Sequence, residues 1–435
     1  MSTAEKVYLQ LTGDDEGRIC RDIPEEACDA QPENFLKHVV ALAATKTGDG
    51  LADAKLVLAW LMGALGAPSY LLGFLVPVRE SGALLPQLIT AGSIRALPLR
   101  KWVWAVGSLV QGLAVMGMGV VALTLTGTAA GWSLIGLLAV MAVARSVCSV
   151  SHKDVLGKTV SKSTRGTATG TASTVASALV LLFGLALAAG ILELSVGTIA
   201  VVLWVAGLLW VVAAAAFTTL AEKPGATEGG GNALTVAFAQ FGLLKTDAQL
   251  RRFILTRALL IATALAPPFL LALAGRSGGA ELGELGTFVI AASLAAVAST
   301  YIWGRLSDVS SRRVLCYAGL IAAVPLLAAA GVGLMAPDLL TVPLLLPSVL
   351  FVLMIAHQGV RLGRATHVVD MADQDTRAAY TALSNTLIGV LLLVGSAFGA
   401  IAEVYGEAVL LGLFALMCLA AAASALSLQE VQAID

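Results

Sequence analysis

Long apolar runs separated by short polar segments dominate the chain from residue 55 onward. A membrane helix needs about 20 mostly apolar residues to cross a hydrocarbon core of roughly 30 Å. The runs show no two-residue alternation, so the pattern favours helices over barrel strands. On this template the sequence predicts twelve spans, at 55–78, 82–97, 102–125, 130–150, 166–192, 196–220, 253–274, 284–304, 314–336, 341–362, 377–402 and 406–427.

The polar segments between the runs suggest a division of the chain. Residues 221–252 form the longest polar interruption after the N-terminal segment, and they separate a bundle at 51–220 from a second bundle at 253–428. Residues 1–50 are polar and acidic and lack the pattern of a cleaved signal peptide. We expect this segment to be cytoplasmic, with an amphipathic helix over 31–46 on the inner membrane surface. Residues 429–435 form a short tail.

Lysine and arginine gather in every second loop, after the second, fourth, sixth, eighth and tenth predicted spans. The opposite loops contain only Arg79 and Arg276. Cytoplasmic loops carry the excess of basic residues, so both termini are predicted to be cytoplasmic. The expected location is the plasma membrane, as in the inner membrane of a bacterium, where the lipid bilayer is the main partner.

The composition agrees with a membrane protein. Of 435 residues, 58% are hydrophobic and 13% are charged, and the mean hydropathy is +0.88. A soluble domain has about 25% charged residues, so a soluble enzyme is excluded. The formal net charge is −1, which gives no basic excess for binding nucleic acid.

Motifs for catalysis or cofactor binding are absent from the sequence. No HExxH or CxxC pattern occurs, and Cys20, Cys28 and His38 fit no zinc spacing. The loop around residues 150–166 lacks the spacing of a phosphate-binding loop. We therefore predict no enzyme activity, no cofactor and no metal, and any uphill transport would draw on a gradient of protons or another ion.

Two similar segments lie 212 residues apart. GSIRALPLRK begins at Gly92 and GRLSDVSSRR begins at Gly304. The matched pairs are Gly92 with Gly304, Arg100 with Arg312 and Lys101 with Arg313. A repeat that relates two sets of six spans predicts two pseudo-symmetric six-helix bundles around a central cavity, which is a transporter architecture.

The segment from Gly304 to Arg313 resembles the signature loop of the major facilitator superfamily, with Gly304, Asp308, Arg312 and Arg313 at matching positions. The resemblance implies an all-α membrane fold of twelve helices. It also implies that Asp308 pairs with a cation on a neighbouring helix and that Gly304 allows close helix packing, so that the loop acts as a conformational switch. The N-terminal copy keeps Gly92 and Arg100 but has Ala96 in place of the aspartate; its basic residues either share the switch or only set topology.

Two ionisable residues interrupt the apolar spans at the same 212-residue offset, Arg145 in the fourth span and His357 in the tenth. Charged groups inside membranes usually face a cavity, and histidine changes charge near neutral pH. This predicts a substrate or coupling pair. Two alternatives remain: Arg145 extends to the cytoplasmic boundary, or His357 only packs helices.

Arg79 and Glu80 fall between the first two predicted spans, with Gln87 further along. We expect a tight turn on the outer side, where Arg79 and Glu80 either form a gate or are simply exposed. Arg257, near the start of the seventh span, is interpreted as an interface anchor.

The sequence thus predicts a secondary active transporter, a monomeric permease that moves a small polar or anionic solute by alternating access, coupled to protons. The alternatives are a membrane assembly factor or sensor of the same fold that transports nothing, and a lipid translocator.

Overall fold

The computed structural model describes residues 3–13, 28–225, 240–276, 284–372 and 377–432, and all regular elements in these ranges are helices. The N-terminal half contains α1 (Thr3–Thr12), α3 (Gln31–Leu51), α4 (Val57–Ala64), α5 (Leu72–Leu84), α6 (Gln87–Arg95), α7 (Lys101–Thr124), α8 (Gly127–Thr159), α9 (Lys162–Ala188) and α10 (Val196–Thr218). The C-terminal half contains α12 (Leu243–Thr246), α13 (Ala248–Leu260), α14 (Ala262–Arg276), α15 (Glu284–Met335), α16 (Leu345–Asp370), α17 (Arg377–Gly395), α18 (Phe398–Tyr405) and α19 (Glu407–Leu426).

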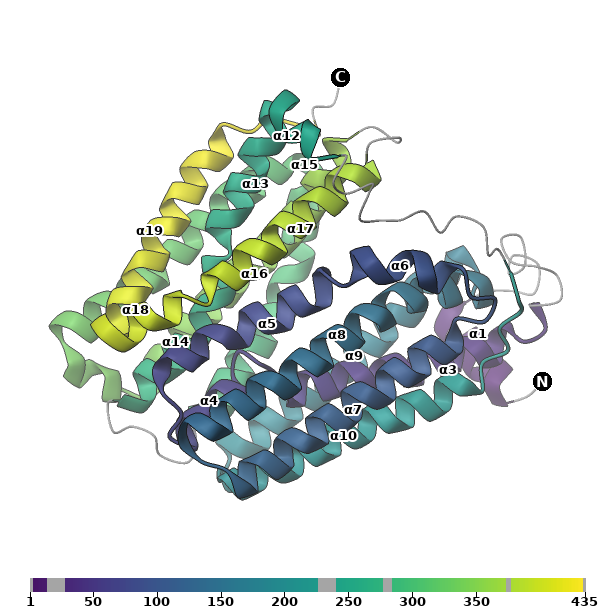
Figure 1. Ribbon diagram of the computed structural model, residues 1–435, viewed down its shortest axis with the longest axis horizontal. Helices are drawn as coiled ribbons and strands as arrows, with labels where there is room; N and C mark the ends of the chain where they lie inside the picture. Colours follow the sequence, from purple (N-terminus) through teal and green to yellow (C-terminus); the bar gives the residue numbers. More distant parts are fainter. Residues whose placement is uncertain (1–2, 14–27, 226–239, 277–283, 373–376, 433–435) are drawn as a thin grey trace.

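The two halves form separate bundles (Figure 1). They converge where α5, α14 and α18 lie together, and they diverge toward the end that carries α6, α12 and the C-terminus. The all-α prediction with two bundles is confirmed.

Nine helical segments within the described ranges are long and apolar enough to cross a membrane. One of them, 285–335, has 51 residues, more than a single crossing needs. The backbone of this segment leaves the helical region at Ser310, with φ −162° and ψ 98°, so α15 consists of two helices joined at a kink. The count of twelve spans stays a prediction.

The first predicted span, 55–78, is wrong as a single helix. Helix α4 ends at Ala64, and the chain then turns through Gly66, whose φ of +71° favours glycine. Pro68 follows and has no N–H to continue the helical ladder. A new helix, α5, begins only at Leu72.

The helix expected over 31–46 is present as α3, but it lies in the N-terminal bundle and not alone on a membrane surface. It packs against α9 and α10. The reason is its buried face, which includes Phe35, His38, Ala41 and Gly48. A Cβ atom at Gly48 would lie 2.8 Å from the ring of Trp210, so glycine is needed for the close contact with α10.

Helix α5 shifts the second predicted span as well. The predicted range 82–97 covers only the end of α5 and all of α6, which are separated near Pro86. Arg79 and Glu80 therefore lie inside α5, and the tight outer turn expected for them is wrong. The loss of the turn follows from the break at Gly66 and Pro68, which moves the helix start to Leu72.

At their converging end, the two bundles pack with their backbones in close contact at glycines. A Cβ atom at Gly399 would lie 2.2 Å from the Tyr70 carbonyl oxygen, and one at Gly73 would lie 2.8 Å from Gly399 Cα. Nearby, Ser69 Oγ donates to Glu407 Oε1 at 3.2 Å. These contacts close one end of the space between the bundles.

Candidate functional site

A cavity of about 580 Å³ lies between the two bundles. Helices of both halves line it, including α5, α8 and α9 on one side and α13, α15, α16 and α17 on the other. A smaller space of about 150 Å³ adjoins it around Asp49. The ionisable residues that line the larger cavity are Lys46, Asp53, Lys55, Arg79, Glu80, Arg145, Arg257, His357, Arg361 and Arg364.

Asp49, near the end of α3, holds two arginines from two other helices. Its Oδ1 accepts from Arg79 Nη2 at 2.6 Å, and its Oδ2 accepts a short hydrogen bond from Arg145 Nη1. The side chains of Arg79 and Asp49 are only 15% and 19% exposed, so the pair is largely removed from water. One carboxylate therefore ties α3, α5 and α8 together at the cavity wall.

A second polar chain crosses between the halves. Lys55 Nζ lies 3.1 Å from His357 Nε2, and Thr263 Oγ1 lies 3.1 Å from His357 Nδ1. The Thr263 hydroxyl also donates to the Leu260 carbonyl at 2.8 Å. With Lys55 charged and donating to Nε2, the proton of a neutral His357 sits on Nδ1 and points to Thr263.

Arg257 is not an interface anchor. Its side chain is 5% exposed, and it donates from Nη1 to Ser384 Oγ and from Nη2 to Asn385 Oδ1. Both partners lie on α17, so the arginine joins α13 to α17 beside the cavity. The helix break between α13 and α14 comes only after Leu260, which keeps Arg257 inside the bundle.

Four predicted site residues meet at the cavity: Arg79, Glu80, Arg145 and His357. Arg145 and His357, related by the repeat, line it from opposite halves. Arg79 pairs with Asp49 of α3, and no ion pair with its neighbour Glu80 occurs in the described part of the chain. Gln87 does not line the cavity; its amide donates to the Ala83 carbonyl one turn back.

Several cavity residues were not anticipated from the sequence. Lys46 and Asp49 belonged to the presumed cytoplasmic segment, although they sit three residues apart on one face of α3. Arg361 and Arg364 were assigned to a loop after a span ending at 362, but α16 continues to Asp370. In both cases two charged residues stand three positions apart beside an apolar run, and this spacing could have indicated a continuing helix.

The signature segment, Gly304 to Arg313, spans the kink of α15 at Ser310, with Gly304 and Asp308 before the kink and Arg312 and Arg313 after it. Asp308 is exposed and has no hydrogen bond or ion pair within the described ranges, and a Cβ atom at Gly304 would meet nothing within 4 Å. The close packing expected at Gly304 is therefore wrong. Arg312 Nε lies 3.5 Å from Glu430 Oε2 in the C-terminal tail, whereas the side chain of Arg313 is exposed.

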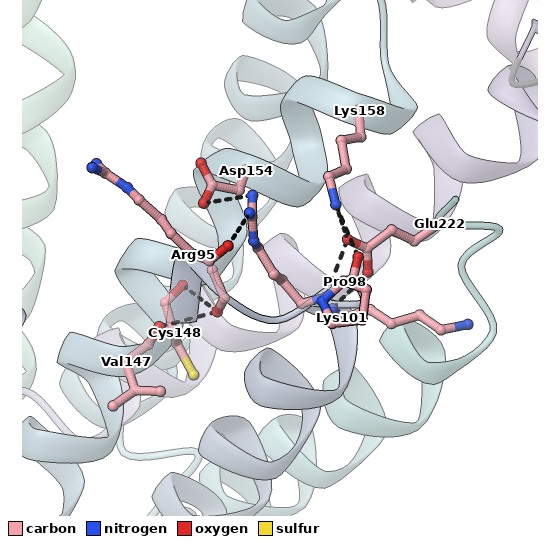
Figure 2. A network of polar contacts seen from close by, with 10 residues as sticks. Arg95, Pro98, Lys101, Val147, Cys148, Asp154, Lys158 and Glu222 are labelled. Carbon is pink, nitrogen blue, oxygen red and sulfur yellow. Dashed lines mark hydrogen bonds and ion pairs between the residues drawn. The ribbon is translucent and has the colours of Figure 1, made fainter. Parts of the chain in front are cut away.

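The N-terminal copy shows a related arrangement (Figure 2). Arg100 pairs with Asp154 of α8 at 3.1 Å. Glu222, just after α10, accepts from the backbone N–H groups of Arg100 and Lys101 and pairs with Lys158. Gly92 lies one helix earlier, in α6. In each half, a glutamate that follows the last helix thus binds at the start of the helix after the signature segment.

The structure is similar to several solved membrane transporters. A mutant of the nucleoside transporter NupG matches with a TM-score of 0.70 and 14% identity, over 91% of this chain and 99% of that chain. A D-xylose–proton symporter matches with 0.67 and 12% identity, over 91% and 98%. A transporter of the POT family in complex with a thioalcohol-conjugated peptide matches with 0.68 and 9% identity, over 93% and 97%. No family model and no curated protein matches the sequence.

Proposed function

The chain has the fold of the major facilitator transporters, and on that premise we propose that it is a secondary transporter that moves a small polar or anionic solute by alternating access, coupled to protons. The observation that carries the proposal is the cavity between the bundles, which both halves line with charged side chains. Charges inside a membrane region are costly and are retained where they serve a function.

Alternating access needs one end of the cavity closed and the other open. The contacts of Gly73 with Gly399 and of Ser69 with Glu407 close the converging end. The diverging end carries the basic loops, so the open end is the cytoplasmic one in this proposal. Rocking of the bundles would break the closed contacts and bring the diverging ends together.

Proton coupling is assigned to His357. A neutral His357 accepts from Lys55, which belongs to the other half. Protonation removes the acceptor at Nε2 and places two positive charges side by side. The proton therefore weakens a link between the bundles, which is what coupling a gradient to rocking requires.

Uptake into liposomes containing the purified protein tests the proposal. Vesicles with an imposed pH gradient receive a mixture of sugars, nucleosides, dipeptides, carboxylates and phosphate esters, and mass spectrometry identifies the solutes retained. We expect uptake of at least one class, which is lost in Arg145→Gln and kept in Lys162→Gln, because Lys162 is exposed at the start of α9 and does not line the cavity. Uptake equal to that of protein-free vesicles for every class would exclude transport of these solutes.

The nine apolar segments and the fold agree with a multi-pass membrane protein. We place it in the plasma membrane with both termini in the cytoplasm, on the strength of its basic loops. The tail residues Glu430 and Gln432 support this arrangement, since they bind Ser310 and Ser311 at the kink between the two parts of α15.

A further inference from the structure

The C-terminal wall of the cavity is unusually cationic. It contains Arg257, Arg361 and Arg364, and no aspartate or glutamate of the described C-terminal half lines the cavity. Around the cavity and the adjoining space, seven lysines and arginines face three carboxylates. All three carboxylates, Asp49, Asp53 and Glu80, belong to the N-terminal half.

The N-terminal carboxylates are already engaged within their own half. Asp49 holds Arg79 and Arg145. Asp53 Oδ1 accepts from the backbone N–H groups of Lys55 and Leu56 at 2.9 and 3.0 Å, where it precedes the start of α4. The charges of Lys55 and Arg79, in its own half, act on Glu80 more strongly than that of Arg364 across the cavity.

The three guanidinium groups of the C-terminal wall have only neutral partners. Arg257 binds Ser384 and Asn385, and its Nε is buried without a partner. Arg361 donates to Gln358 Oε1 at 3.3 Å. Arg364 forms no hydrogen bond or ion pair within the described chain, although it lines the cavity.

The three groups also act on each other. Arg361 and Arg364 are three residues apart on α16 and share one face. Arg364 experiences the charge of Arg361, and its own charge acts on Arg257. While the cavity is open, water screens the repulsion between the guanidinium groups. Closing the cavity removes water and raises the energy of that repulsion. Closure therefore requires negative charge that the C-terminal wall does not supply.

We propose that this C-terminal wall binds a doubly charged anionic group of the transported solute, with Arg361 and Arg364 as its principal ligands. The seven cations around the cavity exceed the three carboxylates by four charges, which is enough to offset a doubly charged group. The planar fork of arginine suits phosphate and carboxylate oxygens, so an organic phosphate or a dicarboxylate is the substrate class. This inference rests on the proposed function, because it names the solute of the same cavity.

Equilibrium binding tests the inference without transport. The full chain in phosphatidylcholine nanodiscs, which lack anionic headgroups, is titrated with methyl phosphate, succinate and neutral glycerol, and both the dissociation constant and the melting temperature are followed. We expect saturable binding of at least one dianion and none of glycerol. Arg361→Gln and Arg364→Gln should each weaken it at least about tenfold, the loss of one charge-assisted contact.

Two further variants keep the test specific. Arg305→Gln removes an exposed arginine of the same half and should bind as the wild type does. Arg364→Lys keeps the charge without the fork, so it should bind more weakly than the wild type but more tightly than Arg364→Gln. The dissociation constants of variants are compared only where the melting temperature without ligand equals that of the wild type. If Arg364→Gln does not fold, Arg364→Lys takes its place in the binding test.

The outcomes separate the inference from the proposed function. Tighter binding of methyl phosphate assigns an organic phosphate, and tighter binding of succinate assigns a dicarboxylate. Failure of both dianions to bind, or binding that Arg361→Gln and Arg364→Gln leave unchanged, overturns the inference, even if neutral solutes are transported. Binding of a dianion without uptake in liposomes would support the site and contradict transport.

Discussion

Lys55 of the N-terminal half and His357 of the C-terminal half meet across the central cavity, with 3.1 Å between Lys55 Nζ and His357 Nε2. Both residues line the cavity. The contact joins a lysine to a histidine whose Nε2 accepts a hydrogen bond only while it carries no proton, so the strength of the contact depends on proton occupancy. In the proposed mechanism, proton binding therefore acts on a contact that links the two bundles.

Removing the carboxylate of Asp49 should destabilise the N-terminal bundle. In Asp49→Asn, Arg79 and Arg145 lose their shared charged partner, and Arg79, whose side chain is 15% exposed, remains as a largely buried cation. We expect a loss of about 3 kcal/mol, near the lower limit for breaking a buried pair because the cavity admits water. The melting temperature of the purified protein measures it. Asp338→Asn, at an exposed position, should change little, and an equal effect of both variants would contradict the assignment.

A methyl group at Gly399 should disfavour the conformation described here. The added Cβ would lie 2.2 Å from the Tyr70 carbonyl oxygen, and the backbone cannot yield as a flexible side chain can. Gly399→Ala should open the converging end and draw the diverging ends together. Double electron–electron resonance between spin labels on α6 and α17 should report shorter distances in Gly399→Ala than in the wild type. Gly331→Ala, where nothing lies within 4 Å, is the control; identical distance distributions in the two variants would refute the prediction.

Glu222 should stabilise the start of α7. Its carboxylate accepts from the N–H groups of Arg100 and Lys101 and pairs with Lys158, and its side chain is fully buried. A negative charge at a helix N-terminus is favourable. Glu222→Gln should therefore cost about 2 kcal/mol, seen as a lower melting temperature. The exposed Glu33→Gln is the matched comparison; no difference between the two would show that the network adds no stability.

Acid should weaken the contact of Asp247 with α17. Burial raises the pKa of this carboxyl, but hydrogen bonds from the Tyr380 hydroxyl and from the N–H groups of Leu250 and Gln249 outweigh it, so the pKa lies below the usual value. A lowered pKa gives stability that is present above the unfolded pKa of about 4 and is lost as the pH falls through the folded value.

The variant Asp247→Asn cannot titrate, so it isolates this contribution. Between pH 6 and pH 3 its melting temperature should fall less than that of the wild type. If the two proteins lose stability in parallel over that range, Asp247 does not contribute to acid sensitivity.

The sequence predicted the all-α bundles and the placement of Arg145 and His357 at one cavity. Arg145 and His357 were recognisable because an isolated ionisable residue in a long apolar run usually faces a cavity. The 212-residue repeat also related the two positions. The sequence did not predict Asp49, because the polar residues of α3 lower the hydropathy of that helix below that of a span. Lys55 stands at the first position of the span predicted over 55–78 and was not recognised as a cavity residue.

Arg361 and Arg364 were missed for a different physical reason. Basic residues at the end of an apolar run favour a cytoplasmic loop under the positive-inside rule. The same residues continue a helix when, as in α16, the chain meets no proline or glycine turn before Asp370. Only the three-dimensional arrangement shows that the two side chains face a cavity and not water outside the membrane.

Accumulation of the solute against its gradient is the measurement that tests the central claim most directly. Liposomes containing wild-type protein or His357→Ala receive the transported solute at equal concentrations on both sides, and a pH gradient is then imposed. We expect the wild type to concentrate the solute and His357→Ala to leave it equal on both sides, whereas Asp338→Asn, altered at an exposed position outside the cavity, should behave as the wild type. Accumulation by His357→Ala to the wild-type level, or none by the wild type, would contradict the claim.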